Sequence, residues 1–269
     1  EVLLLSGGAE GFSMLPRLRP QLVATIHPSF TEPDWVLEQA GIAVHRVILP
    51  PPFELDPTLV PHTADMVILG NPTNPTSVLH PREAVLSLRG SGRMLVIDEA
   101  FADAVLGEGE SVASQSLDDV LVLRSLTKTW ALAGLRCGYA LGHPDVLARL
   151  QYGRAHWPLG SLQIEAIRAC TEPFAVDRAR VESERIHRER TAMTQRLEAL
   201  GLDITGPARA PFLLLRVDGA DVVRERLRTM GIAVRRADTF PGLDRHYLRV
   251  AVRDSQRVDI LVDALKTVL

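Results

Sequence analysis

The sequence is poor in lysine, in cysteine and in aromatic residues. Only Lys128 and Lys266 are lysines among its 30 lysine and arginine residues. Cys137 and Cys170 are too few for a disulfide framework, which favours reduced thiols in a cytosolic protein. Aromatic residues make up 5% of the chain. We therefore expect a cytoplasmic protein, and we examine Lys128 as a residue that arginine could not replace.

Other absences limit the class of protein. No apolar run approaches the roughly 18 residues that a membrane span needs, and Glu1–Leu5 lacks the features of a signal peptide. The formal net charge of −3 offers no basic surplus for nucleic acid. A hydrophobic content of 46% with 23% charged residues is typical of a soluble globular protein. We expect neither a membrane nor a nucleic acid as a partner.

The first residues already read as a core element. Val2–Leu5 resembles a buried strand, and no segment leads into it. Because a domain rarely begins on a buried strand, this pattern indicates a fragment that lacks an N-terminal segment.

Short apolar runs alternate with helical stretches in the first half of the chain. The predicted strands are 22–26, 43–49, 66–69, 94–98 and 120–123, and the predicted helices between them are 31–40 and 80–90. Apolar runs of this length indicate strands covered on both faces. The alternation predicts an α/β fold, with a mostly parallel sheet sandwiched by helices.

The pattern changes after residue 143. Helices are predicted at 144–153, 161–171, 173–200, 220–230 and from 255, and strands at 212–217, 232–235 and 247–252. We therefore expect three parts: a large α/β domain at 1–155, a helical connection at 156–200, and a smaller α+β domain at 201–269. In the connection, alternating charges such as Glu184 and Arg188 indicate a solvated helix face.

Polar motifs follow several predicted strands, where an open parallel sheet binds its ligands. Ser6–Gly11 follows one strand and opens a helix, so its backbone amides could hold a phosphate, although a plain turn would look the same. Asn71–Thr76 contains two Asn-Pro pairs, which keep the backbone extended and stiff. Such a loop can direct the Asn74 side chain, but Asn-Pro is also an ordinary turn signal.

Two further motifs contain ionisable groups. Asp98 ends an apolar strand, where it could bind a ligand, cap a helix or face solvent. Lys128 lies in the run Ser125–Tyr139, which also contains Thr127 and Arg136. A lysine amine can lose its proton and form a Schiff base, whereas a guanidinium cannot.

Together these residues match the needs of pyridoxal phosphate (PLP). A lysine binds its aldehyde, and an anionic Asp keeps its ring nitrogen protonated, so that the ring accepts electrons from the substrate Cα. Hydroxyls and an arginine suit its phosphate. A dinucleotide-binding dehydrogenase would instead need Gly-x-Gly-x-x-Gly after the first strand, which this sequence does not contain.

The chain resembles fold-type I enzymes of the class I/II aminotransferase family, and within it histidinol-phosphate aminotransferases and threonine-phosphate decarboxylases. Asn71–Ser77 is similar to the family motif Asn-Pro-x-Asn-Pro-Thr-Gly, with Ser77 in place of Gly. The resemblance assigns the Schiff base, the ring nitrogen and the phenolic oxygen to Lys128, Asp98 and Asn74. It assigns the cofactor phosphate to Gly8, Ala9, Ser125, Thr127 and Arg136.

The resemblance also implies substrate contacts and departures from the family. Phe30 falls where an aromatic ring stacks on the cofactor, although it could be a core residue. Arg249 matches the arginine that binds the substrate's anionic end, and Arg235 could bind a second anion; Arg253 is another candidate. Phe101 replaces a tyrosine that normally donates to the phenolic oxygen, and it is more usual among the decarboxylases.

We therefore expect a PLP-dependent aminotransferase acting on a small phosphorylated amino compound, with a keto acid or amino acid as co-substrate and no metal. Threonine-phosphate decarboxylase, of cobalamin biosynthesis, is the alternative. A third possibility is a truncated form without cofactor or catalysis, because family members have an N-terminal arm ahead of Val2. The resemblance also implies a homodimer.

Overall fold

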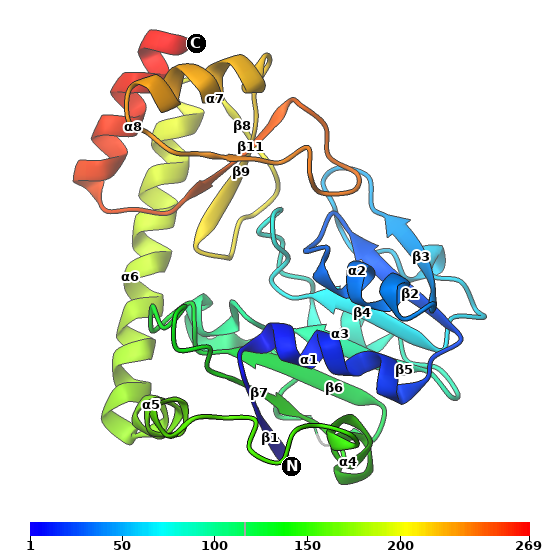
Figure 1. Cartoon of the computed structure of the whole chain (residues 1–269). Helices are drawn as coiled ribbons and strands as arrows, with labels where there is room; N and C mark the ends of the chain where they lie inside the picture. Colours follow the sequence, from blue (N-terminus) through cyan, green and yellow to red (C-terminus); the bar gives the residue numbers. More distant parts are fainter. Residues whose placement is uncertain (116) are drawn as a thin grey trace.

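The computed structural model describes residues 1–115 and 117–269. Two β-sheets organise this part of the chain, one of seven strands and one of four. Figure 1 shows the larger sheet with its helices in the lower part of the view, and the smaller sheet above it. The long helix α6 (Pro173–Glu198) runs along one side, from the region of the larger sheet to that of the smaller.

The larger sheet is mostly parallel. Its strand order is β1-β7-β6-β5-β4-β2-β3. Strand β7 runs antiparallel to its neighbours β1 and β6, and the other pairs are parallel. The strands are β1 (Val2–Leu5), β2 (Leu22–His27), β3 (Ala43–Ile48), β4 (Met66–Gly70), β5 (Met94–Asp98), β6 (Val120–Ser125) and β7 (Gly138–Leu141).

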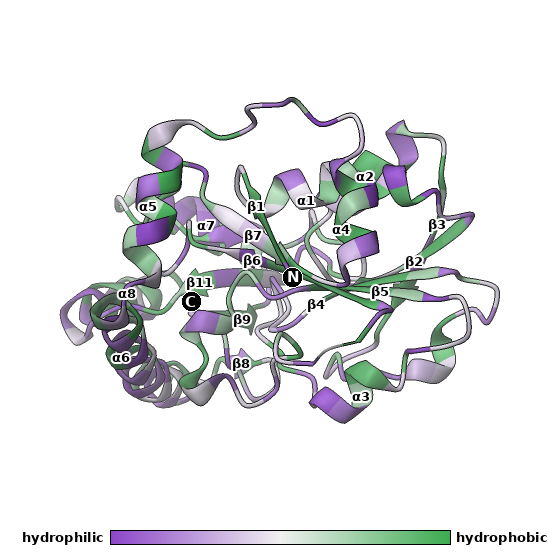
Figure 2. Cartoon of the chain, turned by 90° about the horizontal axis from the view of Figure 1, so that it is seen from below, coloured by the Kyte–Doolittle hydropathy of each residue, from purple (hydrophilic) through white to green (hydrophobic). Residues whose placement is uncertain are grey.

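Both faces of this sheet are covered by apolar side chains. Along β4, Met66 and Ile68 pack into one buried cluster, whereas Val67 and Leu69 pack into another. This division follows from the two-residue period of a strand. Figure 2 shows α1 (Gly8–Met14), α2 (Glu32–Gln39) and α4 (Pro144–Gln151) over one face and α3 (Arg82–Leu86) over the other.

The smaller sheet is antiparallel, in the order β10-β11-β9-β8. Its elements are β8 (Asp203–Ile204), β9 (Phe212–Arg216), α7 (Ala220–Thr229), β10 (Arg235–Arg236), β11 (Tyr247–Ala251) and α8 (Ser255–Val268). Met193 and Leu197 at the end of α6 belong to the same buried cluster as α7 and α8. The connection α5 (Ser161–Thr171) precedes α6 in the chain.

Several local predictions were wrong. The sequence analysis missed β7, because Gly138 and Ala140 have low strand propensity and only the pairing with β1 and β6 makes the segment a strand. It also missed the two-residue strand β8. The helix predicted at 80–90 is limited to Arg82–Leu86, since the amides of Leu88 and Arg89 bond three residues back, as in turns, and not four. The strand predicted at 232–235 is Arg235–Arg236.

The predicted α/β class is confirmed: a mostly parallel sheet lies between helices, with a smaller α+β unit C-terminal to it. We propose the division into 1–155, 156–200 and 201–269 on the basis of the two sheets and the helices α5 and α6 between them. Within the described residues, no helix is both long enough and apolar enough to cross a membrane.

Two adjacent valines of α7 test the packing of the smaller unit. Val223 is buried at 5% exposure, whereas Val222 is 52% exposed. We expect Val223→Ala to lower the free energy of unfolding by about 2 kcal/mol, because it leaves a cavity in the core. The control Val222→Ala should change it by less than about 0.5 kcal/mol. Urea denaturation measures both; equal effects would contradict the observed orientation of α7.

Candidate active site

The predicted site residues gather at the carboxyl edge of the parallel strands. Asp98 ends β5 and Ser125 ends β6, while Asn71 directly follows β4. The register pairs Gly70 with Asp98, and Asp98 with Leu123, so the three strands end side by side. This edge is where ligands bind in open α/β sheets.

One cavity at this edge is lined by every residue predicted to bind the cofactor. Its volume is about 150 Å³. The predicted residues that line it are Gly8, Ala9, Phe30, Asn74, Asp98, Ser125, Thr127, Lys128 and Arg136. They come from the start of α1, the loops after β2 and β4, and the ends of β5 and β6. Residues far apart in the sequence therefore surround one space.

The donors at one end of the cavity suit a phosphate. The amides of Gly8 and Ala9 belong to the first turn of α1, and the Ser125 and Thr127 hydroxyl oxygens lie 2.6 Å apart. The Arg136 guanidinium lies close against Gly7, where an added Cβ would come within 2.7 Å of Nη2. Gly7 also has a φ angle of 77°, which residues with a Cβ rarely adopt, so glycine suits this position. Backbone amides and a guanidinium are donors that suit an anion.

Gly138 allows a second close approach. A Cβ at this position would lie 2.8 Å from the carbonyl oxygen of Arg124 and 2.9 Å from the amide nitrogen of Gly8. The start of β7 therefore packs directly on the backbone of β6 and of the α1 turn. Any larger side chain would push the turn away from Ser125.

Asp98 has an unusual titration. Burial raises the pKa of Asp98 to about 6, although the amide of Ala100 and the charge of Lys128 both act to lower it. The Ala100 N–H donates to Oδ1 at 3.1 Å. The carboxyl group therefore gains from a cationic partner, which is what a protonated pyridine nitrogen provides.

Lys128 and Phe30 border the cavity on its open side. The Lys128 side chain is exposed, and its amine lies 5.6 Å from the ring centre of Phe101. The Phe30 ring is 39% exposed and lies 6.2 Å from that of Phe12. Phe30 is thus a partly open cavity wall and not a core residue.

Asn74 contacts an arginine of the smaller unit. Arg249 Nη1 donates to Asn74 Oδ1. This bond occupies the carbonyl oxygen of the amide, which leaves the Asn74 NH₂ group to donate to a ligand. The Arg249 guanidinium also lies 5.0 Å from the ring centre of Phe212. Burial and the charge of Arg235 lower the pKa of Arg249.

A second, wider cleft of about 640 Å³ adjoins the cavity and shares Phe30, Asn74 and Lys128 with it. Arg235, Arg249 and Arg253 line this cleft. Arg185 lines it too, but it forms ion pairs with Glu182 and Glu189. Arginine side chains therefore line the cleft beside the lysine amine, and their chemistry suits an anion.

One largely buried ionic cluster beside the site was not predicted from the sequence. Arg124 is the second-to-last residue of β6, and it pairs with Glu99, Asp103 and Glu108. Glu99 follows Asp98 directly and raises its pKa. An arginine within an apolar strand was the available signal, because an unpaired charge would be costly there.

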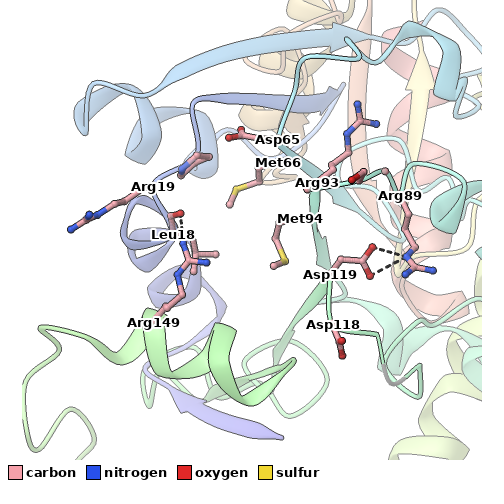
Figure 3. Close-up of a pocket in the computed structure, with 14 residues that line it drawn as sticks. Leu18, Arg19, Asp65, Met66, Arg89, Arg93, Met94, Asp118, Asp119 and Arg149 are labelled. Carbon is pink, nitrogen blue, oxygen red and sulfur yellow. Dashed lines mark hydrogen bonds and ion pairs between the residues drawn. The ribbon is translucent and has the colours of Figure 1, made fainter.

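Another hollow lies at the opposite edge of the sheet and differs in character (Figure 3). It is lined by Met66 and Met94, at the starts of β4 and β5. Its polar groups largely satisfy one another: Arg89 pairs with Asp119, and Arg93 donates to nearby carbonyls. Among the described residues, no cluster of His, Cys, Asp or Glu could hold a metal ion.

Comparisons with known proteins identify the family of the chain. The family "Aminotransferase class I and II" matches residues 1–265. A histidinol-phosphate aminotransferase of Mycobacterium tuberculosis is 58% identical over 253 residues, which cover 94% of this chain and 69% of the relative. The threonine-phosphate decarboxylase of Salmonella typhimurium is 32% identical over 281 residues, covering 99% of this chain and 77% of that protein.

Solved structures show the same fold. The histidinol-phosphate aminotransferase of Clostridium acetobutylicum has a TM-score of 0.90 at 23% identity, over 99% of this chain and 83% of that one. The L-threonine-O-3-phosphate decarboxylase of Porphyromonas gingivalis has a TM-score of 0.85 at 22% identity, over 99% and 82%. From the family match and the relatives together, the chain belongs to the class I and II aminotransferases, a family of PLP-dependent enzymes.

Proposed function

We propose that this chain binds PLP and transfers the amino group of a phosphorylated amino compound of the histidinol-phosphate type. The observation that supports this most is the shared wall of the two cavities: Lys128 and Asn74 border both the smaller cavity and the arginine-lined cleft. The 58% identity to a histidinol-phosphate aminotransferase supports the choice of substrate.

Each residue of the cavity has a proposed role. Gly8, Ala9, Ser125, Thr127 and Arg136 would hold the phosphate of PLP, and Phe30 would lie against its ring. Asp98 would pair with the ring nitrogen, and the Asn74 NH₂ group would donate to the phenolic oxygen. Phe101 has no hydroxyl, so Asn74 would make that bond without help from this position.

When bound, PLP supplies a ring that withdraws electrons from the substrate Cα. The Lys128 amine would hold the cofactor covalently. When free, the same amine would act as the base that takes the proton from the substrate Cα. Lys128 borders both the cavity and the cleft, so its amine lies where cofactor and substrate would meet.

The arginines of the cleft would orient the substrate. Arg249 would bind one anionic group, and Arg235 the second, such as the phosphate; Arg253 lines the same cleft. A guanidinium binds carboxylate or phosphate through paired hydrogen bonds. The keto acid or amino acid co-substrate would use the same groups.

Threonine-phosphate decarboxylation is the second candidate. Two observations favour it: Phe101 lies against the cavity, and a decarboxylase is 32% identical over almost the whole chain. The same residues serve both reactions. The difference is whether the arginines align the Cα–H bond or the Cα–carboxylate bond with the electron-withdrawing ring.

We further propose a homodimer. Large apolar side chains are exposed along one stretch, including Tyr152, Trp157, Leu162 and Phe174. All four lie between residues 152 and 174 of the chain, and large exposed apolar groups are typical of protein interfaces. Sedimentation equilibrium should give twice the mass of one chain, and a monomer at micromolar concentration would contradict this part.

The cofactor assignment is tested by substituting each of the two lysines in turn. PLP added to the purified protein should produce a visible absorbance band, and Lys128→Ala should abolish it, because the covalent link is lost. Lys266→Ala is the control, since Lys266 lies on α8 and pairs with Asp263. An unchanged band in Lys128→Ala, or no band in either protein, would contradict the assignment and support the cofactor-free alternative.

The reaction is tested by its products. With histidinol phosphate and 2-oxoglutarate, we expect glutamate to form, and Lys128→Ala should reduce the rate by at least about 1,000-fold. Release of CO₂ from threonine phosphate, with no glutamate formed, would replace the first candidate by the second.

The raised pKa of Asp98 predicts a pH dependence. Below about pH 6 the carboxyl group becomes protonated and can no longer balance a protonated ring nitrogen. The affinity for PLP should therefore fall by up to about tenfold per pH unit below 6. The Asp98→Asn variant should bind PLP more weakly at pH 7.5, and its affinity should not show this fall below pH 6. Titrations of both proteins between pH 5 and 8 compare them; parallel profiles would refute the assignment.

A further inference from the structure

Ser77 occupies a position that would suit glycine better. Its φ angle is 64°, in the left-handed region, and its side chain is fully buried. Glycine adopts this conformation without strain, whereas a residue with a Cβ does not. A buried serine here requires contacts that compensate for the strained backbone.

Those contacts connect the two structural units. Ser77 Oγ accepts hydrogen bonds from the amides of Arg209 at 3.1 Å and Ala210 at 2.8 Å. The Ser77 carbonyl accepts a further bond from the Arg209 amide at 2.8 Å. Ala210 is fully buried, and across the described residues its amide has no other acceptor. A glycine at 77 would leave that amide unsatisfied, which is costly in a dry interior.

The contacts continue to the proposed substrate arginine. Ala210 lies two residues before Phe212, the first residue of β9. Phe212 pairs in register with Ala251 of β11, and its ring lies beneath the Arg249 guanidinium. Arg249 donates to Asn74, which lies three residues before Ser77 in the same loop. Ser77, Ala210, Phe212, Arg249 and Asn74 thus form a closed ring of contacts, which we call the Ser77 ring.

Arg249 depends on neutral neighbours for its position. Among the described residues, no carboxylate forms an ion pair with it, and its contacts are the Asn74 oxygen and the Phe212 ring. Both belong to the Ser77 ring. A small shift of β9 against the Asn74 loop would therefore move the guanidinium relative to the cofactor cavity.

We infer that Ser77 is a positioning residue, whose hydroxyl holds Arg249 at a fixed place relative to Asn74 and so sets the affinity of the cleft for anionic substrates. This inference rests on the proposed function, because it assigns Arg249 to a substrate anion. It explains why a strained serine stands at this position of the loop. The hydroxyl provides an inter-unit link that a glycine could not make.

The experiment compares Ser77→Ala and Ser77→Gly in the PLP-loaded protein. Both remove the hydroxyl, but only Ser77→Gly also relieves the strained backbone, so its Tm should exceed that of Ser77→Ala. In both variants we expect the Kd for 2-oxoglutarate, measured by calorimetry, to rise about tenfold, as after weakening one charge-assisted contact. The KM should rise with it, while kcat changes less than about threefold. Amide exchange at Ala210 should accelerate.

The control is Ser87→Ala, which removes an exposed serine hydroxyl from the end of α3 and should change none of these values. A Kd within twofold of wild type in Ser77→Gly would overturn the inference. So would a Kd that follows Tm, weakened in Ser77→Ala and restored in Ser77→Gly, because that pattern reflects stability alone. If the wild-type protein shows no Lys128-dependent absorbance band with PLP, the proposed function is overturned, and the inference with it.

Discussion

The register of the parallel strands β4, β5 and β6 is the constraint on which the site depends. Because Gly70, Asp98 and Leu123 are register neighbours, the strands end together. The residues beyond them then face one space. Hydrogen bonding carries this alignment into the loop, since the Asn71 amide donates to the carbonyl of Asp98. A shift of one residue would separate Asp98 from the Asn74 loop and reverse the faces of the strand.

Glycine contacts and buried charges complete this arrangement. Gly7 and Gly138 let Arg136 and β7 approach the α1 turn, so that amide, hydroxyl and guanidinium donors point to one end of the cavity. Asp98 lines the same cavity and is costly to ionise until a cation arrives. The cluster of Arg124 with three carboxylates supports the same strand ends. The site is thus complementary to a ligand with an anionic and a cationic end.

The contacts between the two units determine where a substrate would bind. The smaller sheet provides Arg235 and Arg249, while the larger unit provides Asp98 at the end of β5 and Lys128 in the segment after β6. Reaction at the substrate Cα requires a defined distance between the arginines of the smaller unit and Lys128 and Asp98 of the larger unit. Asn74 touches Arg249 directly, and Ser77 bonds to the segment that leads into β9. A single loop of the larger unit therefore carries both a proposed cofactor contact and the contacts to the smaller unit.

The sequence by itself determined the α/β class, because runs such as Met66–Gly70 are apolar on both faces. It also led to the proposed cofactor residues, because Asp98 ends a strand and Asn74 and Lys128 follow strands closely. It could not indicate β7, whose Gly138 and Ala140 become a strand only between β1 and β6. Nor could it reveal that Arg249 meets Asn74, or that Ser77 bonds to Ala210. Local propensity and periodicity act over a few residues, whereas these contacts join positions more than 130 residues apart. Only tertiary packing brings such positions together.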